Sequence, residues 1–140
     1  MQSKEKDNLI ILRLFPEEDV FVCLKEICQK HKIKTAVVLS GLGQLASFSL
    51  GFFREKGDYA KQDFNLPHEL LSLTGNVSRQ KDGYDFHLHS VLSNEQKQVV
   101  GGHFINGIVS ITAEIVLLKT NLKITRCLEP ATGLSGLFLE

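Results

Sequence analysis

The sequence predicts an α+β fold, in which a mainly antiparallel β-sheet packs against one principal α-helix. A single segment, residues 17–32, has apolar residues at helical spacing. Most of the chain after it consists of short runs rich in β-branched and aliphatic residues, and short polar breaks between them are typical of antiparallel neighbours. A chain of 140 residues has room for one hydrophobic core. We therefore expect a single domain over residues 1–140.

A strand and the helix are the first predicted elements. Residues 9–15 form an almost continuous apolar run that stops at Pro16, which lacks the N–H group that a strand ladder needs. The helix is predicted over residues 17–32, with acidic residues in its first turn and lysines in its last, where each charge favours the helix dipole. The chain is thus expected to run from a strand directly into a helix.

The remaining chain is expected to form strands. Residues 35–40 are followed by Gly41 and Gly43, which predict a tight bend before a further extended run over residues 46–54. An irregular loop is expected over residues 55–67. Further strands are predicted at residues 69–79, 84–92, 98–103, 107–118 and 122–128, and residues 129–140 are expected to form loop or edge structure.

Charge and cysteine content exclude some functional classes. Sixteen basic residues balance sixteen acidic ones, so net charge gives no support to nucleic-acid binding. No apolar run approaches the roughly 20 residues of a membrane helix, and we expect no membrane contact. Cys23, Cys28 and Cys127 fit neither a disulfide framework nor paired zinc knuckles. We therefore expect reduced thiols and a cytoplasmic protein.

Three of the five histidines lie within seventeen residues of one another. His87 and His89 are two apart in a predicted strand, so both side chains project from the same face. If the polar break after residue 92 closes a hairpin, His103 lies opposite or diagonal to His87. These three imidazoles are the predicted ligands of a divalent metal ion.

The chemistry of three imidazoles favours zinc, and iron, nickel or copper less selectively, with a coordination position left for water or a substrate oxygen. The alternative is that an H-x-H pair arises by chance and that Gly101-Gly102 only makes a bulge. His31, at the end of the predicted helix, and His68, in a predicted loop, are not expected to be ligands.

Two carboxylates are candidates for further roles. Glu69 precedes a predicted strand and is a candidate orienting group, fourth ligand or general base, with an ordinary exposed carboxylate as the equal alternative. Glu114 lies within an otherwise apolar strand, where a carboxylate must face solvent or find a partner, and we expect a structural or oligomer contact for it.

Four motifs follow one another along the chain: Ser40-Gly41-Leu42-Gly43, Glu69-Leu70-Leu71-Ser72-Leu73-Thr74-Gly75, His87-Leu88-His89 and Gly101-Gly102-His103. Their order resembles the plant and prokaryote conserved (PPC) domain family over residues 9–128. The resemblance implies a homotrimer and, as in prokaryotic members, a metal held by the residues that match His87, His89 and His103. Family members are often labelled as DNA-binding, but the AT-hook of the plant members is absent from this sequence.

Three functions remain open on this evidence. The first is a trimeric metal-binding protein that binds or acts on a small molecule, and the sequence does not decide whether it is an enzyme. The second is a DNA-associated regulatory or protein-interaction module. The third, a cupin-like metalloenzyme, is weaker because a second cupin motif is missing.

Overall fold

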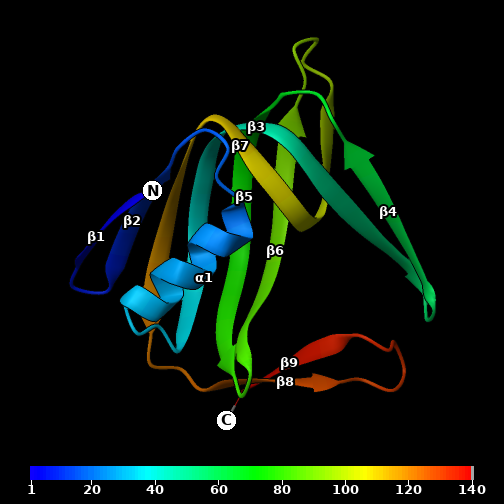
Figure 1. The fold of residues 1–140 in the computed structure, drawn as a ribbon. Helices are drawn as coiled ribbons and strands as arrows, with labels where there is room; N and C mark the ends of the chain where they lie inside the picture. The colour runs from blue at the N-terminus through cyan, green and yellow to red at the C-terminus, as the bar shows by residue number, and fades with distance from the viewer. Residues whose placement is uncertain (140) are drawn as a thin grey trace.

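The computed structural model describes residues 1–139, which form one α-helix and nine β-strands (Figure 1). The elements, in chain order, are β1 (Gln2–Lys6), β2 (Leu9–Leu14), α1 (Val20–Lys30), β3 (Thr35–Glu55), β4 (Asp58–Phe64), β5 (His68–Gln80), β6 (Gly83–Ser93), β7 (Val99–Thr120), β8 (Ile124–Leu128) and β9 (Ser135–Leu139). The predicted α+β class, with one helix and antiparallel strands, is confirmed. No helix in residues 1–139 is long and apolar enough to cross a membrane.

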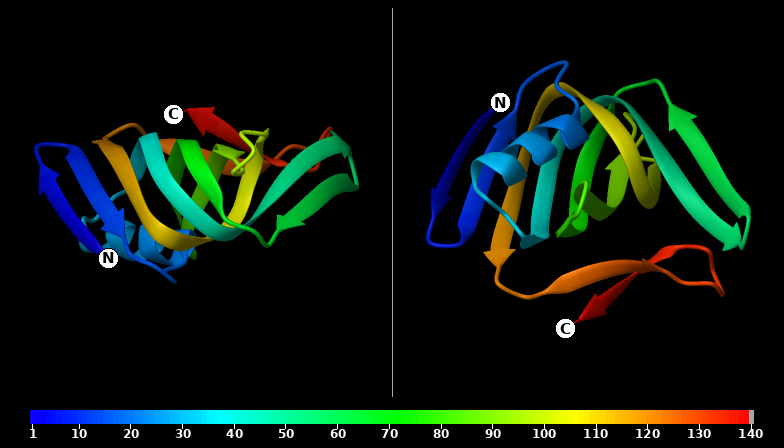
Figure 2. Two further views of the ribbon diagram at one scale, coloured as in Figure 1. Left: turned by 90° about the horizontal axis from the view of Figure 1, so that it is seen from above. Right: turned by 60° about the horizontal axis from the view of Figure 1, so that its bottom comes forward.

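Seven strands form one antiparallel sheet in the order β1-β2-β7-β6-β5-β3-β4, and β7 also pairs with β3. The pairings of β3 with β5, β5 with β6, β6 with β7 and β7 with β3 therefore close a ring. Strands β8 and β9 form a separate two-stranded sheet. Seen from above, helix α1 lies on one side of the curved sheet and this C-terminal hairpin on the other (Figure 2).

Strands β3 and β7 are each more than twenty residues long, whereas the sequence predicted two shorter runs for each. The expected bend at Gly41 and Gly43 is a change of register within β3, not an interruption of it. Gly43 adopts φ 148°, and a Cβ there would lie 2.1 Å from the Thr112 carbonyl oxygen, so only glycine lets the two backbones approach this closely. The strand bends and continues.

Helix α1 is shorter than predicted and begins at Val20. Glu17 has φ 70°, a left-handed conformation that a helix cannot contain, and Asp19 is the N-cap, whose side chain accepts a hydrogen bond from the Val22 N–H. The three acidic residues therefore precede the helix instead of forming its first turn. His31 is the C-cap, as predicted.

The hydrophobic core lies between α1 and the concave face of the sheet. It includes helix residues such as Leu24 and Ile27, and strand residues such as Leu12, Leu88 and Ile115. Alternate residues of the same strands project from the opposite, convex face.

Cys23 and Cys28 are buried free thiols, and burial raises the pKa of Cys23 to about 11 and that of Cys28 to about 12.

The loop predicted over residues 55–67 is wrong, because β4 occupies most of it and pairs with β3. Its residues are mainly polar since both faces of this edge strand are largely exposed, which removes the alternating pattern that marks a half-buried strand. Phe64 anchors the strand by stacking on Phe48 at a centroid distance of 4.6 Å.

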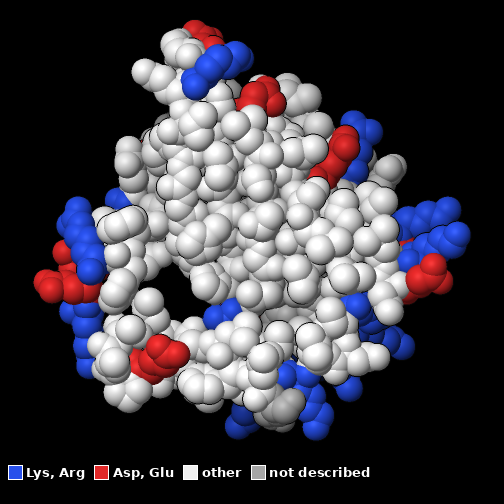
Figure 3. Space-filling view, turned by 180° about the vertical axis from the view of Figure 1, so that it is seen from behind, with Lys and Arg blue, Asp and Glu red and all other residues white. Residues whose placement is uncertain are grey.

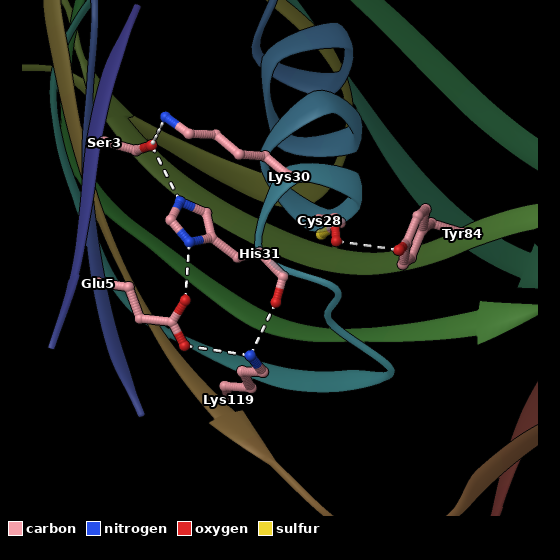
Figure 4. A network of polar contacts seen from close by, with 7 residues as sticks. All are labelled: Ser3, Glu5, Cys28, Lys30, His31, Tyr84 and Lys119. Carbon is pink, nitrogen blue, oxygen red and sulfur yellow. Dashed lines mark hydrogen bonds and ion pairs between the residues drawn. The ribbon is translucent and has the colours of Figure 1, made fainter. Parts of the chain in front are cut away.

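A polar network fastens β1 to the helix end (Figure 4). Glu5 accepts hydrogen bonds from His31 Nδ1 at 2.8 Å and from Lys119 Nζ at 3.1 Å, and Lys119 Nζ also donates to the His31 carbonyl oxygen. Ser3 Oγ lies 3.0 Å from His31 Nε2 and accepts from Lys30 Nζ. The hydrogen bonds from Lys119 and His31 lower the pKa of Glu5.

A Glu5→Gln variant is expected to be less stable than wild type at neutral pH, with the difference shrinking on acidification. Because the pKa of Glu5 is lowered by folding, its contribution is complete above the unfolded value of 4.5 and is lost as pH falls through the folded pKa. Urea unfolding between pH 3 and pH 7, with exposed Glu26→Gln as the control, tests this. A pH-independent difference would contradict it.

Candidate metal centre

The three predicted histidines lie together on the convex face of the sheet. His89 pairs directly with His103 across β6 and β7, and His87 is two residues before His89, so it is diagonal to His103. His87 is also opposite Asn76 on the neighbouring strand β5. Asn76 is in turn opposite Val37 on β3, so His87, Asn76 and Val37 lie in one row on the same face of the sheet.

The three rings converge at short distances. The ring centroids of His87 and His89 lie 5.2 Å apart, and each lies 5.4 Å from the centroid of His103. The Nε2 atoms of His87 and His89 are separated by 3.2 Å. One nitrogen from each ring lies within 4.8 Å of the others.

These distances fit one metal ion. With Zn–N bonds of about 2.0 to 2.1 Å, tetrahedral coordination places two ligand nitrogens roughly 3.3 Å apart. The His87–His89 separation of 3.2 Å agrees with this spacing, and a nitrogen of His103 lies within 4.8 Å of both. In the described chain, no other group of three or more His, Cys, Asp or Glu residues brings its ligand atoms within 4.8 Å of one another.

Glycines set the backbone around the cluster. Gly75 has φ 148°, and a Cβ there would lie 2.0 Å from the His87 carbonyl oxygen, so β5 can approach β6 at this point only with glycine. On the other side, Gly51 is opposite His103 and is covered by the Tyr59 ring, which meets the His103 ring edge-on at 6.1 Å.

The electrostatic surroundings favour neutral imidazoles. Partial burial is the main cause that lowers the pKa of His87, and the positive charge of Arg126 lowers it further, whereas Asp85 opposes the shift. Burial also lowers the pKa of His103, followed by the effects of His87 and His89. Neutral rings present the lone pairs that a metal ion requires.

A cavity of about 770 Å³ opens beside the cluster, between the convex face and the β8-β9 hairpin. Figure 3, which shows the molecule from behind, has an open hollow above this hairpin. The hairpin is held at two places: Arg126 donates to Asn76 Oδ1 on β5, and Lys56 Nζ donates to the Pro130 carbonyl oxygen. The cavity lining also includes Phe52, Phe53, Tyr59, Asp85, Phe86, Leu134 and Ser135.

The structure does not bring Glu69 to this cavity. Glu69 lies at the start of β5, opposite Ser93, and accepts a hydrogen bond from Gln44 Nε2. It is five residues before Thr74, which is opposite His89, a separation of roughly 16 Å along the strand. The sequence analysis missed Arg126, Asp85 and Tyr59, because nothing in the spacing of these residues relates them to the histidines.

The other candidate residues lie outside the cluster. Glu114 is exposed on the convex face of β7, opposite Arg13. His31 belongs to the network at the helix end, and His68 is buried against the rings of Phe48 and Phe64.

The curved antiparallel sheet, the single helix and the three-histidine cluster define a small α+β protein with a candidate metal centre on its convex face. Residues 1–121 match the family described as the Plants and Prokaryotes Conserved (PCC) domain. The chain belongs to this family, which confirms the resemblance found in the sequence. The match ends before β8, so the C-terminal hairpin lies outside it.

Solved structures share the fold over nearly the full chain. A proposed DNA-binding protein of Bacteroides thetaiotaomicron is 24% identical with a TM-score of 0.92, covering 99% of this chain and 96% of its own. A metal-containing protein of Archaeoglobus fulgidus is 27% identical with a TM-score of 0.84, covering 96% and 95%. A plant- and prokaryote-conserved protein of Pyrococcus horikoshii is 28% identical with a TM-score of 0.81, covering 96% and 93%.

Two longer relatives match by sequence. The bifunctional GlmU proteins of two Synechococcus strains are each 31% identical over 131 residues, which cover 92% of this chain and 20% of theirs. The chain thus spans about a fifth of the length of the curated relatives it matches.

A Gly75→Ala variant is expected to separate β5 from β6 and to disturb His87. The closest comparison is Gly83→Ala, because Gly83 has φ 147° but no atom within 4 Å of the added methyl group, against 2.0 Å at Gly75. Both variants carry backbone strain, and Gly75→Ala should cost roughly 2 kcal/mol more in the free energy of unfolding because of the collision. Equal losses in urea unfolding would contradict this role of Gly75.

Proposed function

We propose that this protein is a metal-dependent binding protein or enzyme for a small molecule, with one divalent ion held by His87, His89 and His103. The observation that carries the proposal is the convergence of three imidazoles whose nitrogens lie within 4.8 Å of one another. The adjoining cavity of about 770 Å³ is in the range of small-molecule sites. The Archaeoglobus relative, described as metal-containing, gives further support.

Zinc is the metal we propose, because three neutral imidazoles and one remaining position are typical of zinc sites that bind a water or a ligand. When bound, the ion would supply Lewis acidity at that position. The protein's own residues hold and orient: β6 and β7 fix the three rings, and the ring of Tyr59 packs beside His103. The hairpin bounds one side of the cavity through Arg126, Leu134 and Ser135.

We also propose assembly as a homotrimer, which the family resemblance implies. An apolar patch on the convex face supports it: Leu9, Leu118 and Val37 form one row across β2, β7 and β3, and Ile11 and Leu39 lie beside that row. All five side chains are exposed, from 37% to 53%. Figure 3 shows few charged residues in the centre of the face seen from behind, so an apolar contact there requires little desolvation of charge.

DNA binding is the competing function, and it is less well supported. The proposed DNA-binding relative is 24% identical, a level at which the likeness concerns the fold. The net charge is zero, and the centre of the face in Figure 3 carries few charged residues, so that face offers no broad basic surface. The free thiols, including exposed Cys127, fit a reducing compartment, and we propose a cytoplasmic location.

Elemental analysis of untagged protein tests the metal site. Wild type should contain about one zinc per chain, and His89→Ala should contain almost none, because two imidazoles bind far more weakly than three. His31→Ala is the matched control, since His31 lies in the helix-end network away from the cavity. Zinc retained in His89→Ala, or absent from wild type, would contradict the proposed site.

The native mass tests the assembly. Wild type should have the mass of three chains, and Ile11→Lys should shift it to one, because a charge would be buried in the contact. Leu66→Lys is the control, since Leu66 is 72% exposed and lies outside the apolar patch. A wild-type monomer, or a trimer unaffected by Ile11→Lys, would contradict the proposed interface.

A further inference from the structure

Arg126 is a cationic side chain that the fold leaves partly unsatisfied inside the cavity. It belongs to β8 of the hairpin and lines the cavity together with His87 and His89. Within residues 1–139, no carboxylate forms an ion pair with it, although Asp85 lines the same cavity. A guanidinium stays charged at every physiological pH, so the positive charge is permanent.

The hydrogen bonds of Arg126 do not use its full capacity. Nη1 donates to the Ser135 carbonyl oxygen at 3.1 Å, and Nη2 donates to Asn76 Oδ1. A guanidinium has five N–H donors, so three find no acceptor in the described chain. One of these is on Nε, which is buried without any partner. Buried donors are normally paired, so these N–H groups are available to an acceptor that comes from outside the chain.

The other residues that line the cavity indicate which chemical class of ligand could accept hydrogen bonds from Arg126. Arg126 and Asp85 are its charged residues and offset each other, so an ion at the three histidines would make the cavity positive overall. The aromatic residues Phe53 and Tyr59, which are paired across β3 and β4, supply apolar surface. The site therefore combines a permanent cation, a candidate metal position and an aromatic wall.

We propose that the cavity binds a small organic carboxylate, with Arg126 donating to the carboxylate and the aromatic wall packing against its apolar body. This rests on the proposed function in one respect, namely that the metal site faces the same cavity. The planar fork of arginine matches the geometry of a carboxylate, which favours this group over a neutral amide of the same shape. The hairpin outside the family match thus supplies the specificity of the site.

Isothermal titration calorimetry of the zinc-treated full chain tests this, with phenylacetate as the probe and phenylacetamide as its uncharged counterpart. Wild type should bind phenylacetate and discriminate against phenylacetamide. Arg126→Gln should weaken phenylacetate binding about tenfold or more, as expected for loss of a hydrogen bond between charged groups, with phenylacetamide binding little changed. Arg54→Gln is the matched control, because Arg54 pairs with Asp58 outside this cavity.

A second variant distinguishes direct contact between Arg126 and the ligand from an indirect effect, in which Arg126 only positions the hairpin. Asn76→Ala removes the same link between Arg126 and β5 but keeps the charge. It should bind phenylacetate within a few-fold of wild type. If Asn76→Ala loses binding as fully as Arg126→Gln, Arg126 acts only by positioning the hairpin, and the proposal is overturned. If Arg126→Gln fails to fold, as judged by circular dichroism, Arg126→Lys takes its place and should lose part of the affinity.

Metal content, measured on every sample, keeps the two proposals apart. Wild type without zinc would contradict the proposed function, whereas Arg126-dependent binding of phenylacetate in that sample would still support the carboxylate site. Zinc in wild type, with phenylacetate either unbound or bound equally by Arg126→Gln, would overturn the carboxylate site and leave the metal site standing.

Discussion

The pairing of β7 with three other strands is the constraint on which the rest of the structure depends. Its C-terminal half lies between β2 and β3, and its first residues pair with β6. A single strand can pair with all three neighbours only if the sheet curves and closes. The register shifts in β3, and the glycines where two strands approach most closely, make this closure possible. The same closure places His103 opposite both His89 and Gly51, and so creates the cluster.

Local patterns predicted those parts of the structure in which one face is buried. The boundaries of β5 and β6 lie within one residue of the prediction, and the period of two placed His87 and His89 on one face. Strand β4 was missed because both its faces are exposed, and the two halves of β3 and of β7 were separated because glycine signals both a turn and a close approach of two strands. Local sequence contains no information that distinguishes these two uses.

The residues of the candidate site could also be predicted only in part from the sequence. A hairpin between neighbouring strands can be inferred from sequence, and this was sufficient for the three histidines. Arg126 reaches the cavity from β8, after the chain has turned away from the main sheet, and Tyr59 reaches it from a strand that was not predicted. Residues brought together by tertiary structure alone have no shared spacing, so only the fold relates them to the three histidines.

The apolar patch and the candidate site are physically continuous. The row of Leu9, Leu118 and Val37 continues through Asn76 to His87, and Asn76 also accepts the hydrogen bond from Arg126. A partner chain on the patch would therefore border the residue that links the hairpin to the sheet. Excluding water from that border lowers the local dielectric and strengthens the interaction of Arg126 with any anion in the cavity. Assembly and ligand binding would then favour each other through one row of the sheet, without a change in the fold of either chain.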